Sequence, residues 1–347
     1  MHIFFRVDSS VKIGTGHVMR CLTMAKRLQE KGAQVSFICR DLKGNINEMI
    51  QSQGFTLYEL NTSGEDFDWK KDAEMTSHIL QQQQKINWLI IDHYDIDIKW
   101  ESTLRADVQK IMVIDDLANR PHECDILLDY NFYIQAEKRY DGLVPPRTLK
   151  LLGQNYLTLR DEFIKARKNL NKNYDSINRL LISFGGTDET NETLKALKAV
   201  EQFSHPLTVD VVVGATNEHQ ALIKDWCSKY QYVNYHSQVD DMATLMKHAD
   251  VAIGAGGSSS YERCYLGLPT LVIETATNQR ELIHSLQTYG VIHFLGEAKD
   301  VSEADITHTL QNMIKNKALI HDMSLRCLSL FEHDMNENKV INHLLEG

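Results

Sequence analysis

Several features that would place this protein in another class are missing from its 347 residues. The six cysteines stand at wide, irregular spacings without a C-x-x-C pair, so we expect free buried thiols in a reducing compartment. No apolar run approaches the roughly 20 residues that cross a bilayer. The start of the chain lacks a basic region followed by a long apolar core, and it reads as a β-strand instead of a signal peptide. Together these absences predict a cytoplasmic protein without a membrane span.

Positive charge is also scarce. Lys and Arg number 37 against 47 Asp and Glu, which gives a net charge of −10. This balance argues against nucleic acid or an anionic membrane as the partner. An anionic ligand would need local contacts from helix ends and a few basic side chains.

Short β-rich runs alternate with helical patterns along the chain, which is typical of α/β sheets. The expected strands are 3–7, 34–39, 56–59, 88–91, 111–114, 179–184, 208–213, 232–235, 251–253, 270–273 and 291–294. The polar stretch 167–175 between the two series predicts a linker. We therefore expect two doubly wound, Rossmann-like α/β domains, residues 1–166 and 176–347, facing each other across a cleft. Whether the last helix packs back on the first domain stays open.

The most informative motif is Gly14–Arg20, GTGHVMR, between the strand at 3–7 and a helical pattern. A glycine-bearing loop at a helix start offers unpaired N–H groups to a ligand, and Gly14 and Gly16 are the candidates. His17 adds a titratable base, which a helix start favours in its neutral form. The motif therefore predicts catalysis more than packing.

Three further residues in or near this motif are candidates for the same site. Arg20, one turn into the helix, either anchors the loop or touches substrate. Asp8, at the end of the first strand, is the candidate residue for orienting His17. Tyr94 follows a strand end, where open α/β sheets gather their ligands, and it could equally be a packing residue.

A second glycine-rich segment, residues 254–269, follows the strand 250–253. Serines 258–260 are suited to cap the next helix and to bind an anion. Glu262 could accept hydrogen bonds from ribose hydroxyls, or could be an ordinary first-turn carboxylate. The loop 183–188 could close over the same phosphates. The candidate nucleotide contacts are Gly186, Thr187, Gly256, Gly257, Ser258 and Glu262.

A family resemblance runs over nearly the whole chain. It is carried by residues 6–10, 13–22, 90–94, 124–128, 153–163, 183–188, 254–269 and 278–279. In these segments the chain resembles the UDP-sugar hydrolases of pseudaminic acid biosynthesis, which hydrolyse UDP-2,4-diacetamido-2,4,6-trideoxy-β-L-altropyranose. That family resembles the inverting GT-B glycosyltransferases. The resemblance implies a GT-B-like fold, with UDP held by the C-terminal domain and the sugar facing the N-terminal one.

The resemblance also implies the reaction. Water attacks the anomeric carbon with inversion and UDP leaves, through an oxocarbenium-like transition state, releasing 2,4-diacetamido-2,4,6-trideoxy-L-altrose. His17 matches the family's general base. Arg160, Glu262 and Asn278 are carried over as contacts to UDP or the UDP-sugar, and Tyr94 as a wall of the sugar site. Arg160 could instead form a domain-interface ion pair. Neither a cofactor nor a metal is expected.

Two other functions stay open at this stage. One is a GT-B glycosyltransferase with a UDP-sugar donor, although segment 41–70 lacks the apolar or basic loop of a membrane-associated transferase. The other is a non-catalytic nucleotide-sugar-binding protein, which would not need His17 beside intact glycine loops. For each function the expected partner is a small-molecule UDP-sugar and no nucleic acid, and a monomer is expected.

Overall fold

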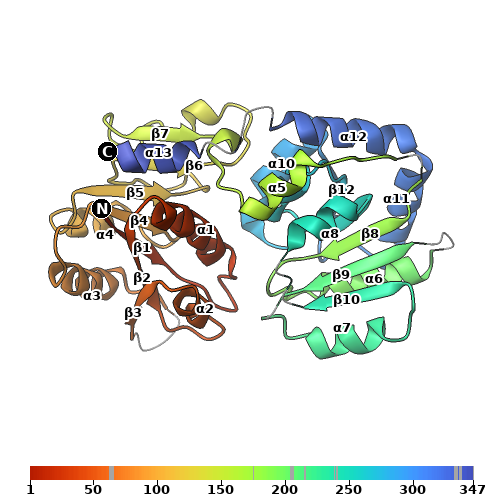
Figure 1. Ribbon diagram of the computed structural model, residues 1–347, viewed down its shortest axis with the longest axis horizontal. Helices are drawn as coiled ribbons and strands as arrows, with labels where there is room; N and C mark the ends of the chain where they lie inside the picture. The colour runs from red at the N-terminus through yellow and green to blue at the C-terminus, as the bar shows by residue number, and fades with distance from the viewer. Residues whose placement is uncertain are drawn as a thin grey trace. The chain divides into compact units, whose positions relative to one another are not determined.

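The computed structural model describes residues 1–61, 66–174, 176–203, 207–214, 216–237, 239, 241–331, 335 and 338–346. The chain forms two compact units: unit 1 contains residues 1–158 and 337–347, and unit 2 contains residues 159–336. Both are α/β units built on a parallel sheet (Figure 1). Among the described helices, none has the length and apolar character needed to cross a membrane.

Unit 1 has a seven-stranded sheet in the order β3-β2-β1-β4-β5-β6-β7, with every neighbouring pair parallel. Its strands are β1 (His2–Val7), β2 (Gln34–Arg40), β3 (Thr56–Leu60), β4 (Trp88–Asp92), β5 (Lys110–Ile114), β6 (Ile126–Asp129) and β7 (Leu149–Leu152). Its helices are α1 (Gly16–Glu30), α2 (Asn47–Ser52), α3 (Trp69–Gln81), α4 (Ile98–Leu104) and α13 (Lys339–Glu346), with 3₁₀ turns η1 (Ala136–Lys138) and η2 (Gln154–Tyr156). The strand order reverses between β1 and β4, and open α/β sheets bind ligands at such a switch point, outside the carboxyl ends of the strands.

Unit 2 has a six-stranded parallel sheet in the order β10-β9-β8-β11-β12-β13. Its strands are β8 (Arg179–Ser183), β9 (Thr208–Val213), β10 (Val233–Ser237), β11 (Val251–Ala255), β12 (Thr270–Glu274) and β13 (Ile292–Glu297). Its helices are α5 (Asp161–Lys168), α6 (Glu192–Glu201), α7 (Gln220–Cys227), α8 (Met242–His248), α9 (Ser259–Tyr265), α10 (Arg280–Tyr289), α11 (Glu303–Lys315) and α12 (Lys317–Ser329), with the 3₁₀ turn η3 (Thr277–Gln279). The order reverses between β8 and β11, the two strands followed by glycine loops.

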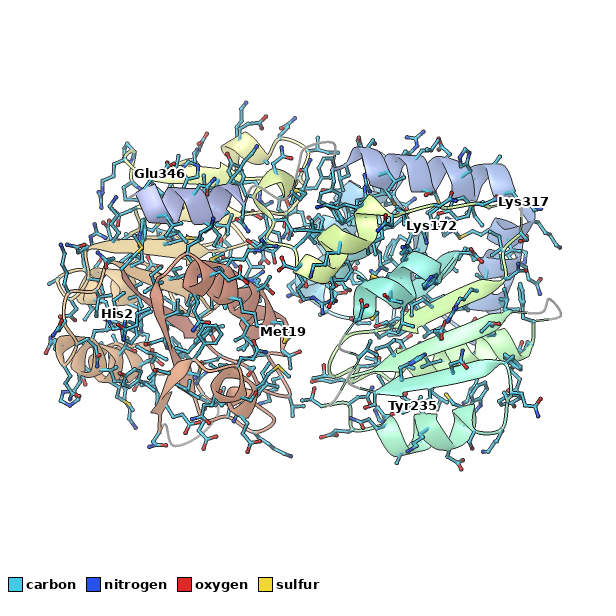
Figure 2. The ribbon with its side chains drawn as sticks, viewed as in Figure 1. His2, Met19, Lys172, Tyr235, Lys317 and Glu346 are labelled. Carbon is cyan, nitrogen blue, oxygen red and sulfur yellow. The ribbon has the colours of Figure 1, made fainter. Side chains whose placement is uncertain are left out.

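The two units meet along the chain before α5, ahead of the polar stretch that the sequence marks as a linker. Helix α5 packs against α8 and α9 of unit 2, with Phe163 and Ile164 buried. Arg167 donates to the carbonyl of Leu328 at 3.1 Å. Lys172, which Figure 2 labels, donates to the carbonyls of Met246 and Ala249 at the end of α8. Because these polar side chains pack within unit 2, the boundary between the units that composition alone predicts lies too far along the chain.

The last helix belongs to unit 1, which answers the question that the sequence leaves open. The apolar face of α13 is buried through Val340, Ile341 and Leu344. The indole N–H of Trp88, in β4, donates to the carbonyl of Leu344 at 3.0 Å. The chain therefore returns to its first sheet after completing the second.

Candidate functional site

The switch point of unit 1 brings together the residues around His17. Val7 at the end of β1 is the register partner of Asp92 at the end of β4, and α1 begins at Gly16. Nδ1 of His17 lies 2.6 Å from Oδ1 of Asp92. Arg20, one turn further along α1, donates to both oxygens of Asp92, from Nε at 2.5 Å and from Nη2 at 2.6 Å. Asp92 therefore holds the imidazole and the guanidinium together.

This contact assigns the tautomer of His17. A carboxylate only accepts hydrogen bonds, so the short contact with Asp92 requires a proton on Nδ1. Nη2 of Arg20 also lies 3.0 Å from Nδ1, but a guanidinium only donates and cannot share that proton. When Nδ1 carries the only proton of the ring, the lone pair is on Nε2, which has no hydrogen bond to any described residue. His17 can therefore act as a proton acceptor.

Asp92 stays ionised despite its burial. Burial alone raises the pKa of this carboxyl, but the charges of Arg20 and His17 and their hydrogen bonds outweigh it and hold the pKa well below its usual range. Arg20 is itself held by the hydroxyl of Tyr130 at 2.9 Å and more loosely by Asp116 at 3.4 Å. The site is therefore a fixed network of charged groups in contact with the imidazole of His17.

The residue that orients His17 is Asp92, which corrects the expectation for Asp8. Asp8 accepts hydrogen bonds from the side chain of Arg6 at 2.5 Å, from Nε of Arg40 at 2.6 Å and from Nε2 of His93 at 3.0 Å. Arg6 and Arg40 are both buried beside Asp8. The carboxylate of Asp8 therefore neutralises positive charge at the carboxyl end of the sheet. The sequence places Asp92 at a strand end, where ligand-site residues gather, but it did not indicate that Asp92 contacts His17.

Tyr94 lies against His17, and Gly14 and Gly16 lie in the segment that leads to His17. The Tyr94 ring meets the imidazole edge-on, with ring centroids 4.6 Å apart, so the structure supports its place beside the candidate base. Gly14 has a φ of +78°, in the left-handed region that favours glycine. A Cβ at Gly16 would meet nothing within 4 Å, so packing does not require this glycine.

In unit 2, the loop after β11 is built by close packing around one of its glycines. A Cβ on Gly256 would lie 2.3 Å from Cγ1 of Ile283, whereas one on Gly257 would come no closer than 3.9 Å to Gln279. The N–H of Gly256 donates to Oε1 of Gln279 at 3.2 Å. Ser258 occupies the N-cap position of α9 but makes no side-chain capping bond, contrary to expectation. Its hydroxyl has no hydrogen bond to a described residue.

A buried cation lies beneath this loop, and sequence reasoning missed it. Arg263 is 2% exposed, and it donates to the carbonyl of Ala255 at 2.6 Å and to the hydroxyls of Ser259 and Ser260. Burial lowers the pKa of its guanidinium to about 10, so it stays charged at neutral pH. Within the described residues no carboxylate forms an ion pair with it. The spacing of the serines three and four residues before Arg263 is the signal that could have found it.

Glu262 and Arg160 contact each other within unit 2. Nη2 of Arg160 donates to Oε1 of Glu262 at 2.9 Å and Nε to the same oxygen at 3.2 Å. Arg160 also pairs with Glu162 at 2.9 Å. The second oxygen of Glu262 has no hydrogen bond to a described residue and can accept a ligand's hydroxyl. Arg160 thus forms ion pairs with partners of its own unit, whereas the alternative expected one at the domain interface.

The remaining candidates lie at the carboxyl ends of β8 and β12. Ser183 of β8 is the register partner of Gly254 of β11, so the loop bearing Gly186 and Thr187 starts beside the loop after β11. The carbonyl of Gly186 accepts from Thr216 at 3.0 Å. Asn278, exposed in η3, follows β12. Among the described residues, no group of three or more His, Cys, Asp or Glu side chains could hold a metal ion.

The sequence is similar to a family model and to known hydrolases. Residues 180–338 match the family model described as the glycosyltransferase family 28 C-terminal domain. A UDP-2,4-diacetamido-2,4,6-trideoxy-β-L-altropyranose hydrolase from Campylobacter jejuni is 30% identical over 260 residues, which are 74% of this chain and 86% of the relative. A pseudaminic acid cytidylyltransferase and UDP-2,4-diacetamido-2,4,6-trideoxy-β-L-altropyranose hydrolase from Helicobacter pylori is 24% identical over 78% of this chain and 44% of its own length.

Solved structures agree on the fold. MurG from Acinetobacter baumannii has a TM-score of 0.69 at 13% identity, covering 100% of this chain and 99% of its own. UDP-GlcNAc 2-epimerase from Neisseria meningitidis has a TM-score of 0.64 at 12% identity, with both chains covered completely. These likenesses and the two parallel-sheet units confirm the expected GT-B-like fold. The chain belongs to the family of UDP-2,4-diacetamido-2,4,6-trideoxy-β-L-altropyranose hydrolases.

Proposed function

We propose that the protein hydrolyses UDP-2,4-diacetamido-2,4,6-trideoxy-β-L-altropyranose to UDP and 2,4-diacetamido-2,4,6-trideoxy-L-altrose, with inversion at the anomeric carbon. Family membership supports the substrate. The observation that carries the chemistry is the hydrogen bond from Nδ1 of His17 to Asp92. It leaves the lone pair of Nε2 available to take a proton from water.

The proposed step is a single displacement. The water oxygen bonds to the anomeric carbon while its proton passes to Nε2 of His17, and the bond from that carbon to the diphosphate oxygen breaks. UDP departs with the electron pair, so no covalent intermediate forms and the configuration inverts. Asp92 stabilises the imidazolium as it forms. A positioned general base of this kind contributes typically about 10²–10⁴-fold in rate.

The nucleotide contacts of the proposal lie in unit 2. Glu262 accepts hydrogen bonds from the ribose hydroxyls, and the loops bearing Gly186, Thr187 and Gly256–Ser258 surround the diphosphate, with Asn278 as a further contact. The cation of Arg263 beneath the second loop, unpaired with any described carboxylate, favours negative charge there. Because these groups stabilise the leaving diphosphate, the proposed reaction includes no metal or cofactor.

The test is UDP release from a panel of UDP-sugars, followed by NMR with the purified protein. We expect turnover of the diacetamido-altrose donor without an added acceptor, and the β-configured donor should give the inverted anomer first. His17→Ala should lose turnover by at least about 10²-fold while retaining UDP binding. Turnover that survives this substitution would show that another group is the base.

The second candidate function is transfer of a sugar from a UDP-sugar to an acceptor. It is favoured by the glycosyltransferase family 28 match over residues 180–338. UDP release that requires an added acceptor would support it and would contradict hydrolysis. Binding of UDP without turnover of any donor, with or without acceptors, would instead indicate a nucleotide-sugar-binding protein.

A further inference from the structure

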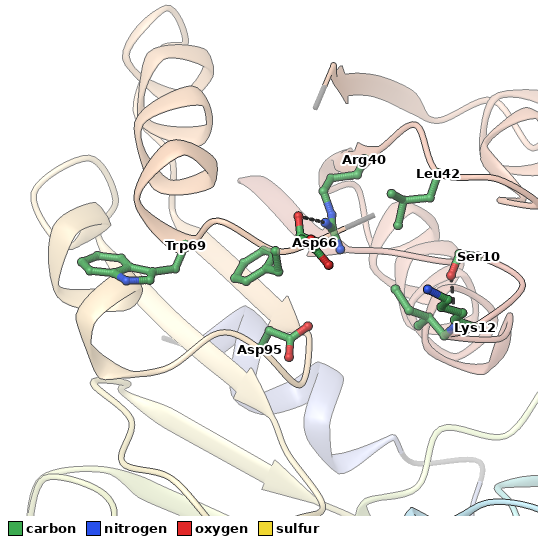
Figure 3. Close-up of a pocket in the computed structure, with 9 residues that line it drawn as sticks. Ser10, Lys12, Arg40, Leu42, Asp66, Trp69 and Asp95 are labelled. Atoms are coloured by element: carbon green, nitrogen blue, oxygen red, sulfur yellow. Dashed lines mark hydrogen bonds between the residues drawn. The ribbon is translucent and has the colours of Figure 1, made fainter. Parts of the chain in front are cut away.

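Unit 1 contains a pocket of about 620 Å³ at the carboxyl ends of β1, β2, β3 and β4 (Figure 3). Its volume is within the range of small-molecule sites. The side chains that determine its chemistry are Lys12, Arg40, Asp66, Phe67, Trp69 and Asp95. None of them belongs to the His17 network.

The pocket shares two chain segments with the candidate base. Its wall includes Ser10, in the loop that leads to His17, and Ser10 fixes this loop by accepting from the N–H of Gly14 at 2.8 Å. Its other wall includes Asp95, next to Tyr94, whose ring packs on His17. The backbone N–H of Asp95 donates to His93 at 3.1 Å. A ligand in the pocket therefore contacts the two segments that position the base.

The aromatic side of the pocket is held in a fixed orientation. The guanidinium of Arg40 lies 5.1 Å from the Phe67 ring centroid, and the ring of His93 lies 4.6 Å from the same ring. Arg40 is 2% exposed, and Asp8 fixes it from below at 2.6 Å. The buried Asp8 network, which does not touch His17, thus supports the pocket instead.

The charges that line the pocket balance. Lys12 and Arg40 are cationic, and Asp66 and Asp95 are anionic. A diphosphate placed here would meet two carboxylates, whereas an uncharged ligand with both donors and acceptors would find partners for each. Phe67 and Trp69 add apolar faces for carbon-bound hydrogens and methyl groups. The lining thus favours a neutral, amide-bearing sugar over a nucleotide.

We propose that this pocket binds the sugar moiety of the UDP-sugar, with Trp69 and Asp95 as residues that determine specificity for its acetamido substituents. The inference rests on the proposed function and deepens it, since it assigns where the sugar is recognised. Binding in this pocket adds to affinity for the glycosyl group and contributes nothing to affinity for UDP alone.

The test separates sugar recognition from nucleotide recognition in the full-length protein. Trp69→Ala and Asp95→Asn should each raise KM for the UDP-sugar by about tenfold, with the inhibition constant of UDP unchanged within about twofold. Trp69→Phe, which keeps an aromatic face, should restore most of the affinity. Trp226→Ala, a tryptophan of α7 in unit 2, is the matched control and should leave both constants unchanged.

A second measurement tests the pocket independently of turnover. Saturation-transfer NMR with the free 2,4-diacetamido-2,4,6-trideoxy sugar should show binding to the wild-type protein and its loss in Trp69→Ala. If the wild type does not hydrolyse the UDP-sugar but this binding pattern holds, the proposed reaction fails and the pocket assignment stands. An unchanged KM in both variants, or an equal loss of UDP affinity, would overturn the assignment.

Discussion

The two units have similar sheets, but the residues at the carboxyl ends of their strands differ in chemistry. In unit 1 the carboxyl ends of β1 and β4 carry ionised and titratable side chains, centred on the pair of His17 and Asp92. In unit 2 the ends of β8 and β11 carry glycine loops, and the buried cation Arg263 donates to the carbonyl of Ala255 at the start of the second loop. Side chains can move protons, whereas backbone N–H groups and a fixed charge can hold an anion. The contrast therefore predicts that chemistry and nucleotide binding can be damaged separately.

The largest separate effect is expected for Asp92→Asn. An asparagine can donate to Nδ1 and favours the tautomer with the proton on Nε2, which cannot accept a proton from water. We expect kcat to fall by about 10³-fold, with UDP affinity retained because the proposed nucleotide contacts are in unit 2. Steady-state kinetics and calorimetric titration of UDP measure the two quantities. A parallel loss of UDP affinity would contradict the division of labour.

The reciprocal substitution, which should weaken nucleotide binding, is made in the glycine loop after β11 of unit 2. The Cβ of Gly256→Ala would collide with Ile283, so we expect about 1–3 kcal/mol lower free energy of unfolding and at least tenfold weaker UDP binding. Gly257→Ala is the matched variant, because its Cβ has room in the protein. It should leave stability within about 0.5 kcal/mol and weaken UDP only if the diphosphate lies against it. Equal stability losses from the two alanines would show that the loop packs differently.

Two buried ionisable groups also make stability depend on pH, with opposite signs in the two units. Burial, together with the charge of Asp116, raises the pKa of Asp129 in unit 1 to about 7. Between pH 3.8 and about 7 the folded state then holds more protons than the unfolded one, so this group makes stability fall as pH rises, by at most about 1.4 kcal/mol per pH unit. Asp129→Asn should remove that slope in denaturant titrations across this range.

In unit 2, burial lowers the pKa of Lys172 to about 8. The unfolded chain holds more protons between that pH and 10.5, so stability from this group rises with pH in the window. Lys172→Met should remove this rise of stability with pH. A slope that survives both substitutions would assign the pH dependence to other groups.

Local motifs explain why much of the fold and part of the site could be predicted. Alternating strand and helix patterns identified the strands β1 to β5 and β8 to β13, but the short strands β6 and β7 were missed. A strand of only four residues carries little periodicity, and pairing with β5 is what makes Ile126–Asp129 a strand. The glycine loops were identified because both of their signals, glycines and a strand end, are adjacent in the sequence.

The partners of the site residues could not be predicted in the same way. His17 was identified from its own motif, but Asp92 is 75 positions away. Arg160 and Glu262 are 102 positions apart. Such pairs depend on strand order and register, and a one-residue change in pairing would turn these side chains to the other face. The resemblance suggested roles for single residues without saying which residues touch.

The amino-acid sequence by itself determined the α/β class, the positions of the glycine loops after β1 and after β11, and the presence of a histidine beside the first of these two loops, because each depends on neighbours within a few residues. Tertiary structure decided that Asp92 and not Asp8 orients His17, that Arg263 is buried beneath the second loop, and that α13 returns to unit 1. These outcomes depend on which strands pair and on where burial outweighs solvation. The free energies of strand pairing and of burial come from contacts between distant parts of the chain.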